Sequence, residues 1–268
     1  MENILRINSD IPHINPDIVF HIGTFPVANS TLMIVFLAVL IGFAAFVLRK
    51  KDALVPDALQ NFAEGSYEAI FNLINQVTSN RLITAYIFPL IGSILIFVLL
   101  SNIEGLIPGI NEITYNGVAV FRSPTSDFNT TFGVALAMIL LIQLASIRDY
   151  GIGGYIGKFL QFKQVWQGFR SSIKEGGMAI IMFLIGLLDI VSEIAKVVSL
   201  SLRLFGNMYA GQVLATVILA GFAYGLPALW MSLSTLSAVV QTIVFALLLT
   251  AYYSTSVNMK EVAERLQK

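Results

Sequence analysis

The sequence predicts an all-α integral membrane protein, and three observations support this prediction. Its residues are 56% hydrophobic and only 12% charged, whereas a typical soluble domain is about 25% charged. Several apolar segments are long enough to cross a bilayer, which takes about 20 helical residues. Basic residues gather at alternate ends of these segments, as expected for spans of fixed orientation. We therefore expect five membrane spans.

The chain divides into five parts with different expected surroundings. Apolar stretches are assigned to the membrane, amphipathic ones to its surface, and polar stretches rich in Gly and Pro to loops. The expected parts are an external tail at 1–29; three membrane helices within 30–147, including an interfacial helix at 52–80 and an external loop at 102–127; a cytoplasmic loop at 148–177; a membrane hairpin at 178–257; and a cytoplasmic tail at 258–268.

The basic residues also set the expected orientation. Of the 16 Lys and Arg, only Arg6 and Arg122 fall on segments expected outside, and Lys196 and Arg203 lie within the hairpin. Cytoplasmic loops carry the excess of Lys and Arg, so we expect the N-terminus outside and the C-terminus in the cytoplasm. No signal or transit peptide pattern is present, which favours a bacterial plasma (inner) membrane.

The last two spans are too long to stand upright in a bilayer. A helix over 178–222 would be about 68 Å long and one over 228–257 about 45 Å. The hydrocarbon core is only about 30 Å thick. The sequence therefore predicts a steeply tilted or bent hairpin, with its turn at Gly225 and Pro227.

A polar stripe follows the first arm of this hairpin. At about 100° per residue its five members share an arc of about 80° and cover about 27 Å of helix. Ionisable groups are expensive in lipid, so we expect the stripe to line water or to face a partner. The five members are Asp189, Glu193, Lys196, Arg203 and Asn207.

Arg203 is the most demanding residue of the stripe. Near the bilayer centre an arginine costs about 3 kcal/mol on insertion scales, and it cannot lose its proton to escape that cost. No acidic residue lies three or four positions away, whereas Glu193 has Lys196 at i+3. Arg203 is thus either a functional, unpaired arginine, which the spacing favours, or a structural one paired with Asp189 or Glu193.

Composition excludes several classes of site. The chain has no cysteine, so thiolate metal sites, disulfides and cysteine nucleophiles are absent. Its formal net charge is zero, so the composition gives no sign of the basic surface that a nucleic-acid-binding protein carries. His13 and His21 lie in the N-terminal tail without a second ligand at metal spacing. We expect no metal, no cofactor and no nucleic-acid partner.

Three rival functions are weighed against an ion path. A secondary transporter would carry internal repeats and helices broken at the midplane, and the sequence shows no repeat. An intramembrane enzyme would carry a motif such as HExxH or GxSxG, and neither is present. A purely structural membrane subunit would pair its charges internally and would tolerate an apolar residue in place of Arg203.

The segment Ser199–Gly211, SLSLRLFGNMYAG, resembles the SLxLRLFGNxxAG signature of subunit a of the F-type ATP synthase. The resemblance extends to NIEGLIPG at 102–109, SDFNTT at 126–131 and Gln241. That family has upright helices and a long hairpin nearly parallel to the membrane, which packs against a ring of c subunits. The resemblance implies a proton-channel (stator) subunit that is not an enzyme alone, with the c-ring, the b-subunit peripheral stalk and the lipid bilayer as partners.

The resemblance also implies roles for individual residues. Arg203 matches the essential coupling arginine, which faces the ring and separates two half-channels. Asn207 matches an asparagine one turn on, and Gln241 a glutamine close to the arginine. Asp189 matches an acidic position of the cytoplasmic half-channel. Ser192 and Lys196 match polar positions of the same stretch, to which the stripe adds Glu193.

The sequence departs from the family pattern at two positions. Many members place Glu or His nine residues after the arginine and an ionisable partner seven before the glutamine, but these positions hold Gln212 and Ser234 here. We therefore expect an external half-channel of water held by polar side chains, with Asp127 at its mouth. Glu104 and Glu112 are weaker candidates for this half-channel, and the interpretation favoured for both is an exposed loop acid. The polar side chains are Asn207, Gln212, Ser234, Ser237 and Gln241.

Overall fold

The computed structural model describes residues 15–49, 57–107, 110, 113–115, 118–159, 173–221 and 225–267. Some expectations fall on residues outside these ranges. They concern most of the N-terminal tail with His13, the acid Glu112, the middle of the expected cytoplasmic loop at 160–172, and the start of the hairpin turn at 222–224.

Helices make up most of the described residues. They are α1 (Asn29–Arg49), α2 (Ala58–Thr78), α3 (Arg81–Glu104), α4 (Phe128–Phe159), α6 (Ile173–Gly221), α7 (Leu226–Ser256) and α8 (Met259–Gln267), with a short 3-10 helix η2 (Pro124–Ser126). Two small antiparallel hairpins accompany them, formed by β1 (Ile18–Ile22) with β2 (Phe25–Ala28) and by β3 (Thr114–Tyr115) with β4 (Val118–Ala119).

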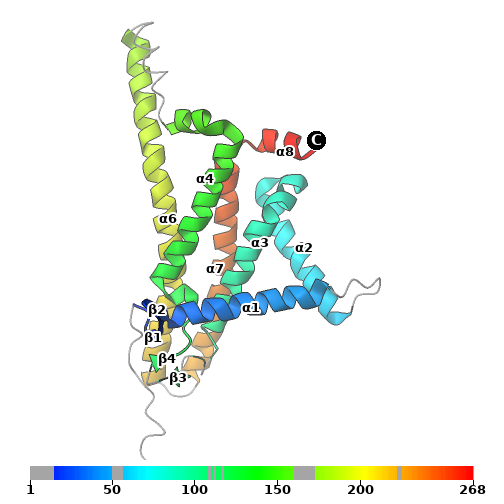
Figure 1. Ribbon diagram of the computed structural model, residues 1–268, viewed down its shortest axis with the longest axis vertical. Coiled ribbons are helices and arrows are strands. Elements are labelled where there is room, and N and C mark those ends of the chain that lie inside the picture. The colour runs from blue at the N-terminus through cyan, green and yellow to red at the C-terminus, as the bar shows by residue number, and fades with distance from the viewer. Residues whose placement is uncertain are drawn as a thin grey trace, which may run out of the picture.

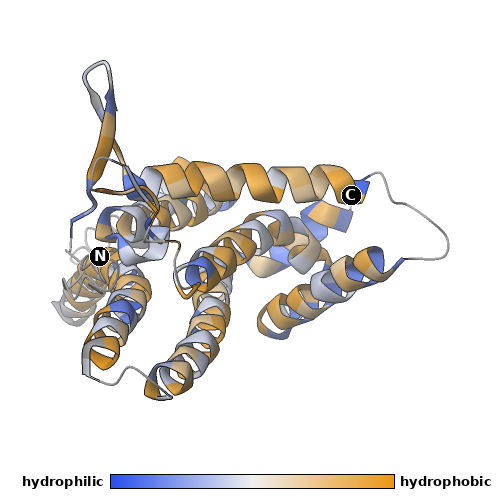
Figure 2. Ribbon diagram, turned by 90° about the horizontal axis from the view of Figure 1, so that it is seen from below, coloured by the Kyte–Doolittle hydropathy of each residue, from blue (hydrophilic) through white to orange (hydrophobic). Residues whose placement is uncertain are grey.

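Four of these helices form a bundle that α1 crosses. α3, α4, α6 and α7 run along the long axis of the molecule and pack on one another, whereas α1 runs across this direction along one side of the bundle (Figures 1 and 2). α1 has 21 residues, about 31 Å of helix, which just spans a hydrocarbon core. α6, with 49 residues, is about 74 Å long, more than twice the thickness of a hydrocarbon core.

The prediction of an all-α membrane protein is confirmed. Within the described residues, four helices are long and apolar enough to cross a membrane, namely α1, α3, α7 and the 128–155 part of α4. α6 corresponds to the remaining expected span, is 49 residues long and carries the polar stripe near its middle. Hydrophobic residues also cover the outer faces of the helices (Figure 2), as expected for a protein solvated by lipid.

The core lies where the four bundle helices meet. α3 contributes Ile83, Ile87, Ile91, Leu95 and Val98, which recur every three or four residues and so form one buried face. Polar bonds fix the contacts of this bundle: Asn102 Nδ2 donates to Thr242 Oγ1 at 3.0 Å between α3 and α7, and Ser146 Oγ donates to the Ser256 carbonyl at 2.8 Å between α4 and α7.

Two segments expected as loops are partly helical. The residues at 148–159 were expected in a cytoplasmic loop but continue α4 as helix, and Gly151 bends that helix with φ 70° and ψ 161°. Glycine adopts this conformation without steric cost, so the first helical stretch of α4 ends at Gly151 and a second stretch continues to Phe159 in another direction. Arg265 of α8 donates to Asp149 Oδ1 at 2.8 Å, which ties the bent segment to the C-terminal helix.

The second correction concerns the end of α3. The external loop was expected from residue 102, but the helix continues to Glu104 and is followed by Gly105. Gly105 lies tightly against the segment before η2, because a Cβ added there would come within 2.9 Å of Ser123 Cβ. Ser123 Oγ also donates to the Ser101 carbonyl at 2.7 Å, so this segment covers the last turn of α3.

Replacing Gly105 by Ala is expected to lower the thermal stability of the protein, because overpacking a filled site costs about 1–3 kcal/mol. Gly133→Ala in α4 is the matched control, since a Cβ there meets nothing within 4 Å. It should leave stability unchanged or raise it, as Ala favours helix over Gly by roughly 1 kcal/mol. Thermal unfolding in detergent compares the two, and equal midpoints would contradict the packing described for Gly105.

Candidate functional site

Arg203 lies on an exposed, largely apolar side of α6. Its side chain is exposed, and it forms no salt bridge with any described residue. Its neighbours Leu202 and Val198 are 50% and 42% exposed. Of the two interpretations left by the sequence, the geometry favours the unpaired arginine.

One of the two acids of the stripe, Glu193, is already paired. Glu193 Oε1 accepts from Lys196 Nζ at 2.7 Å, and Glu193 Oε2 accepts from Gln143 Nε2 of α4. Tyr155 donates to Gln143 Oε1 at 3.0 Å, and Lys196 Nζ lies 5.2 Å from the centre of the Tyr252 ring of α7. This group, Gln143, Tyr155, Glu193, Lys196 and Tyr252, is called the α4–α6–α7 polar network. Asp189 and Ser192 are exposed beside it.

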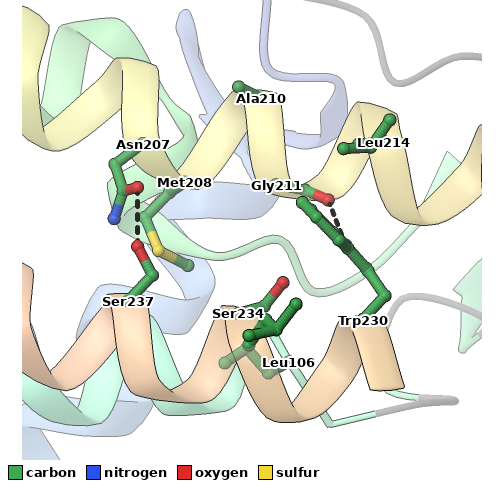
Figure 3. A pocket seen from close by; sticks show the side chains of 10 residues that line it. Leu106, Asn207, Met208, Ala210, Gly211, Leu214, Trp230, Ser234 and Ser237 are labelled. Carbon is green, nitrogen blue, oxygen red and sulfur yellow. Dashed lines mark hydrogen bonds between the residues drawn. The ribbon is translucent and has the colours of Figure 1, made fainter. Parts of the chain in front are cut away.

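A hydrogen bond defines the register of α6 against α7. Ser237 Oγ donates to Asn207 Oδ1 at 3.0 Å (Figure 3). The two helices are antiparallel, so one turn back on α6 corresponds to one turn on along α7. Arg203 is therefore in register with Gln241.

A pocket of about 310 Å³ lies next to this bond, between α6 and α7. Trp230 closes one end of it by donating from Nε1 to the Gly211 carbonyl at 3.3 Å (Figure 3). Ser234 Oγ is buried without a hydrogen-bond partner among the described residues. The pocket is lined by Leu106, Asn207, Met208, Ala210, Gly211, Leu214, Trp230, Leu233, Ser234 and Ser237.

The remaining predicted polar side chains lie outside that lining. Gln212 is turned about 140° from Asn207 around α6, and its Nε2 lies 3.4 Å from the Cβ position of Gly105 at the end of α3. Nε2 of Gln212 and Nε2 of Gln241 are both buried without a partner among the described residues. The structure thus brings Asn207, Ser234 and Ser237 together and directs Gln212 towards α3.

Asp127 is the N-cap of α4. It is 3% exposed, and its carboxylate accepts from Ser30 Oγ at 2.7 Å, from Asn129 N at 3.0 Å and from Thr130 Oγ1 at 3.2 Å. Carboxylates stabilise helix N-termini by accepting such bonds. The same carboxylate lies near Arg122, whose pKa burial lowers and the negative charge of Asp127 raises.

Glu104 corrects an expectation from the sequence. It was expected as an exposed loop acid, but it is 6% exposed and ends α3. Both carboxylate oxygens are buried and accept no hydrogen bond from a described residue. The sequence held a signal for this, because Glu104 continues the buried face of α3 three residues after Ser101 and six after Val98.

Comparison with known proteins decides the family. The family model of the ATP synthase A chain matches residues 30–254. The chain belongs to this family. ATP synthase subunit a of Moorella thermoacetica is 28% identical over 246 residues, which covers 92% of this chain and 98% of the relative. That of Campylobacter concisus is 31% identical over 226 residues, covering 84% and 87%.

The family membership confirms the resemblance found at Ser199–Gly211. As a member of the subunit a family, the chain is a proton-translocating part of a membrane sector and not a catalyst by itself. Groups of three or more His, Cys, Asp or Glu that could hold a metal ion do not occur among the described residues. The roles of Arg203 and of the other predicted site residues stay predictions.

The register of α6 against α7 can be tested by cross-linking, because the chain has no cysteine of its own. Two double variants are expected to form a disulfide under mild oxidation. One is Arg203→Cys with Gln241→Cys, and the other is Asn207→Cys with Ser237→Cys. Arg203→Cys with Ser234→Cys is the control, since Ser234 is seven residues, or about 10 Å of helix, from Gln241. Cross-linking is measured by gel mobility, and a stronger product from the control pair would overturn the register.

Proposed function

We propose that this chain is the stator subunit through which protons reach and leave a rotating c-ring by two offset half-channels, with Arg203 between them. The observation that carries the proposal is the position of Arg203. It is an exposed, unpaired cation of the described chain on an apolar helix face, with a separate polar region towards each end of the helix.

The exposed face around Arg203 suits a ring of apolar helices. Small residues flank the arginine on this face, including Ala195, Ser199, Gly206 and Ala210, and small side chains let helices approach closely in membranes. Beyond them large apolar side chains are exposed on both helices. These are Leu184, Leu188 and Val191 of α6 and Leu229, Leu233 and Leu236 of α7.

The coupling mechanism follows from electrostatics. A ring carboxylate that has taken up a proton is neutral and can cross lipid, whereas its charged form is costly there. When the carboxyl group reaches Arg203, the positive charge lowers its pKa and favours proton release. The carboxylate must then take a new proton before it moves back into lipid. The fixed charge of Arg203 also repels protons that would pass directly between the half-channels.

The two polar regions become the two half-channels. Asp189, Ser192 and the α4–α6–α7 polar network lie towards the N-terminal part of α6 and form the cytoplasmic one. The pocket with Asn207, Ser234 and Ser237 lies towards its C-terminal part and belongs to the external one. A proton crossing between them gains about 2.3 kcal/mol per 100 mV of membrane potential.

The remaining external residues surround that pocket. Gln241 stands in register with Arg203, Gln212 points towards the end of α3, and Asp127 holds the start of α4 at the mouth of the external side. Water held by these groups supplies the path.

The chain sits in a bacterial plasma membrane with its N-terminus outside and its C-terminus in the cytoplasm. α2 then lies on the cytoplasmic surface, where its exposed Phe62 and Leu59, 78% and 50% exposed, meet the lipid interface. The b-subunit stalk holds the chain against the turning ring, because a stator must resist the drag of the rotor.

Arg203→Ala is expected to abolish ATP-driven proton uptake in membrane vesicles that carry the complete ATP synthase. Removing a unit positive charge about 4 Å from a carboxylate raises the free energy of the ionised carboxylate by about 4 kcal/mol at an effective dielectric constant of 20. This corresponds to a loss of roughly a hundredfold or more in flux. Uptake is followed with a pH-sensitive fluorescent dye, beside ATP hydrolysis as the measure of assembly.

The matched control is Arg148→Ala, an exposed arginine of α4 away from the stripe, which should keep wild-type uptake. If Arg203→Ala vesicles pump near the wild-type rate, then the arginine is structural and the proposed coupling fails.

A further inference from the structure

Glu104 is a buried carboxyl group that caps no helix N-terminus and forms no ion pair with a described residue. Its side chain is 6% exposed, and neither oxygen accepts a hydrogen bond within the described part of the chain. Burying a carboxylate without a partner costs several kcal/mol, so such a group is retained where its proton is used. The same position would hold an apolar residue at no such cost.

The surroundings of Glu104 connect it to the α6–α7 pocket. The preceding polar residue, Asn102, donates to Thr242 of α7, and the following residue, Gly105, lies against Gln212 of α6. Leu106, two residues on, lines the pocket with Asn207 and Ser234. The end of α3 is thus inserted between the two helices that carry the external polar groups.

The two helices that form the walls of the pocket offer no competing proton carrier at this end. α6 after Arg203 and the whole of α7 contain no Asp, Glu, His, Lys or Arg. Asp127 accepts three hydrogen bonds as the cap of α4. Arg122 donates to the carbonyls of Asn15 and Ser126, at 2.7 and 3.2 Å. Among the described acids near the pocket, Glu104 is the buried one whose oxygens are not engaged.

We propose that Glu104 is the proton-carrying carboxylate of the external half-channel. This inference rests on the proposed function. It also accounts for Gln212 and Ser234, neither of which titrates, because the ionisable group has moved from α6 and α7 to the end of α3. Its neighbours place it at this end of the pocket, since Gly105 lies against Gln212 and Leu106 is part of the pocket lining.

The step balances with one proton. During ATP synthesis the Glu104 carboxylate takes a proton from external water and forms a neutral carboxylic acid. That acid then gives its proton, through water beside Gln212 and Ser234, to the ring carboxylate near Asn207. Glu104 returns to its starting charge, and one proton has passed from outside to the ring. Pumping by ATP hydrolysis runs the same transfers in reverse.

Glu104→Gln is the direct test, because glutamine keeps the shape and cannot carry a proton. In vesicles with the complete ATP synthase, we expect ATP-driven proton uptake to fall about tenfold while the complex assembles and hydrolyses ATP. Glu104→Asp keeps an acid and should retain most of the flux. Glu68→Gln, an exposed acid of α2, is the control and should pump as wild type does.

A second variant separates proton transfer from packing. Gln212→Glu in the Glu104→Gln background restores one carboxyl group beside Gly105, and we expect it to recover proton flux. A purely structural Glu104 would not be rescued by an acid on another helix. Failure of the rescue in an assembled complex, together with loss of flux in Glu104→Asp, would assign Glu104 a structural role.

Vesicles with Arg203→Ala are measured in parallel. They separate a failure of the role proposed for Glu104 from a failure of the proposed function. Wild-type flux in Glu104→Gln with no flux in Arg203→Ala overturns the role of Glu104 alone. Wild-type flux in both variants overturns the proposed function as well.

Discussion

A guanidinium group keeps its positive charge in any protein environment, and the arrangement around Arg203 follows from that constraint. A carboxylate of this chain paired with Arg203 would offset its charge permanently. Under the proposed function, that charge could then no longer act on a carboxyl group of the ring. The nearest stripe acid, Glu193, lies ten residues or about 15 Å along α6 and is held by Lys196 and Gln143. On the other side α6 and α7 carry no charge until their ends. The fold therefore isolates one cation on an apolar face and keeps the other charges paired or remote.

The hydroxyl groups of α7 divide into two kinds. Ser232, Thr235, Thr242 and Thr250 each donate to the carbonyl four residues earlier, at 2.8–3.0 Å, which satisfies a hydroxyl inside a helix without any outside partner. Ser234 and Ser237 do not follow this pattern. Ser237 binds Asn207, and Ser234 has no partner among the described residues. The number of polar residues on a membrane helix is thus a poor guide to its function. Ser234 and Ser237, which do not bond to their own helix, both line the pocket, whereas Ser254, whose hydroxyl also has no partner among the described residues, lies near the other end of α7.

Sequence reasoning recovered the features that depend on one helix and missed those that depend on contacts between segments. The stripe from Asp189 to Asn207 follows from 3.6-residue periodicity, and the structure has it on one continuous helix. The bend at Gly151 escaped, because a glycine at positive φ lets a helix turn where the composition indicates a loop. Glu104 was missed because the segment before η2, which is distant in sequence, packs on the residues around it, with Ser123 bonded to Ser101 and close to Gly105. The hydrogen bond between Asn207 and Ser237 could not be predicted, because it depends on how α6 and α7 align with each other and the sequence of either helix alone does not determine this.

α6 is one uninterrupted helix of 49 residues, about 74 Å long, and its continuity has a mechanical consequence. Under the proposed function, a ring that turns against its exposed face exerts a sideways force near the middle of this helix, where Arg203 lies. A broken or hinged helix would yield there, and the arginine would follow the ring instead of holding its place. α4 packs along α6, and Phe205 lies edge-on to Phe128 at the start of α4 with ring centres 5.7 Å apart. Under this proposal, α4 and α6 share the sideways force, so that the force turns the rotor and does not bend the stator.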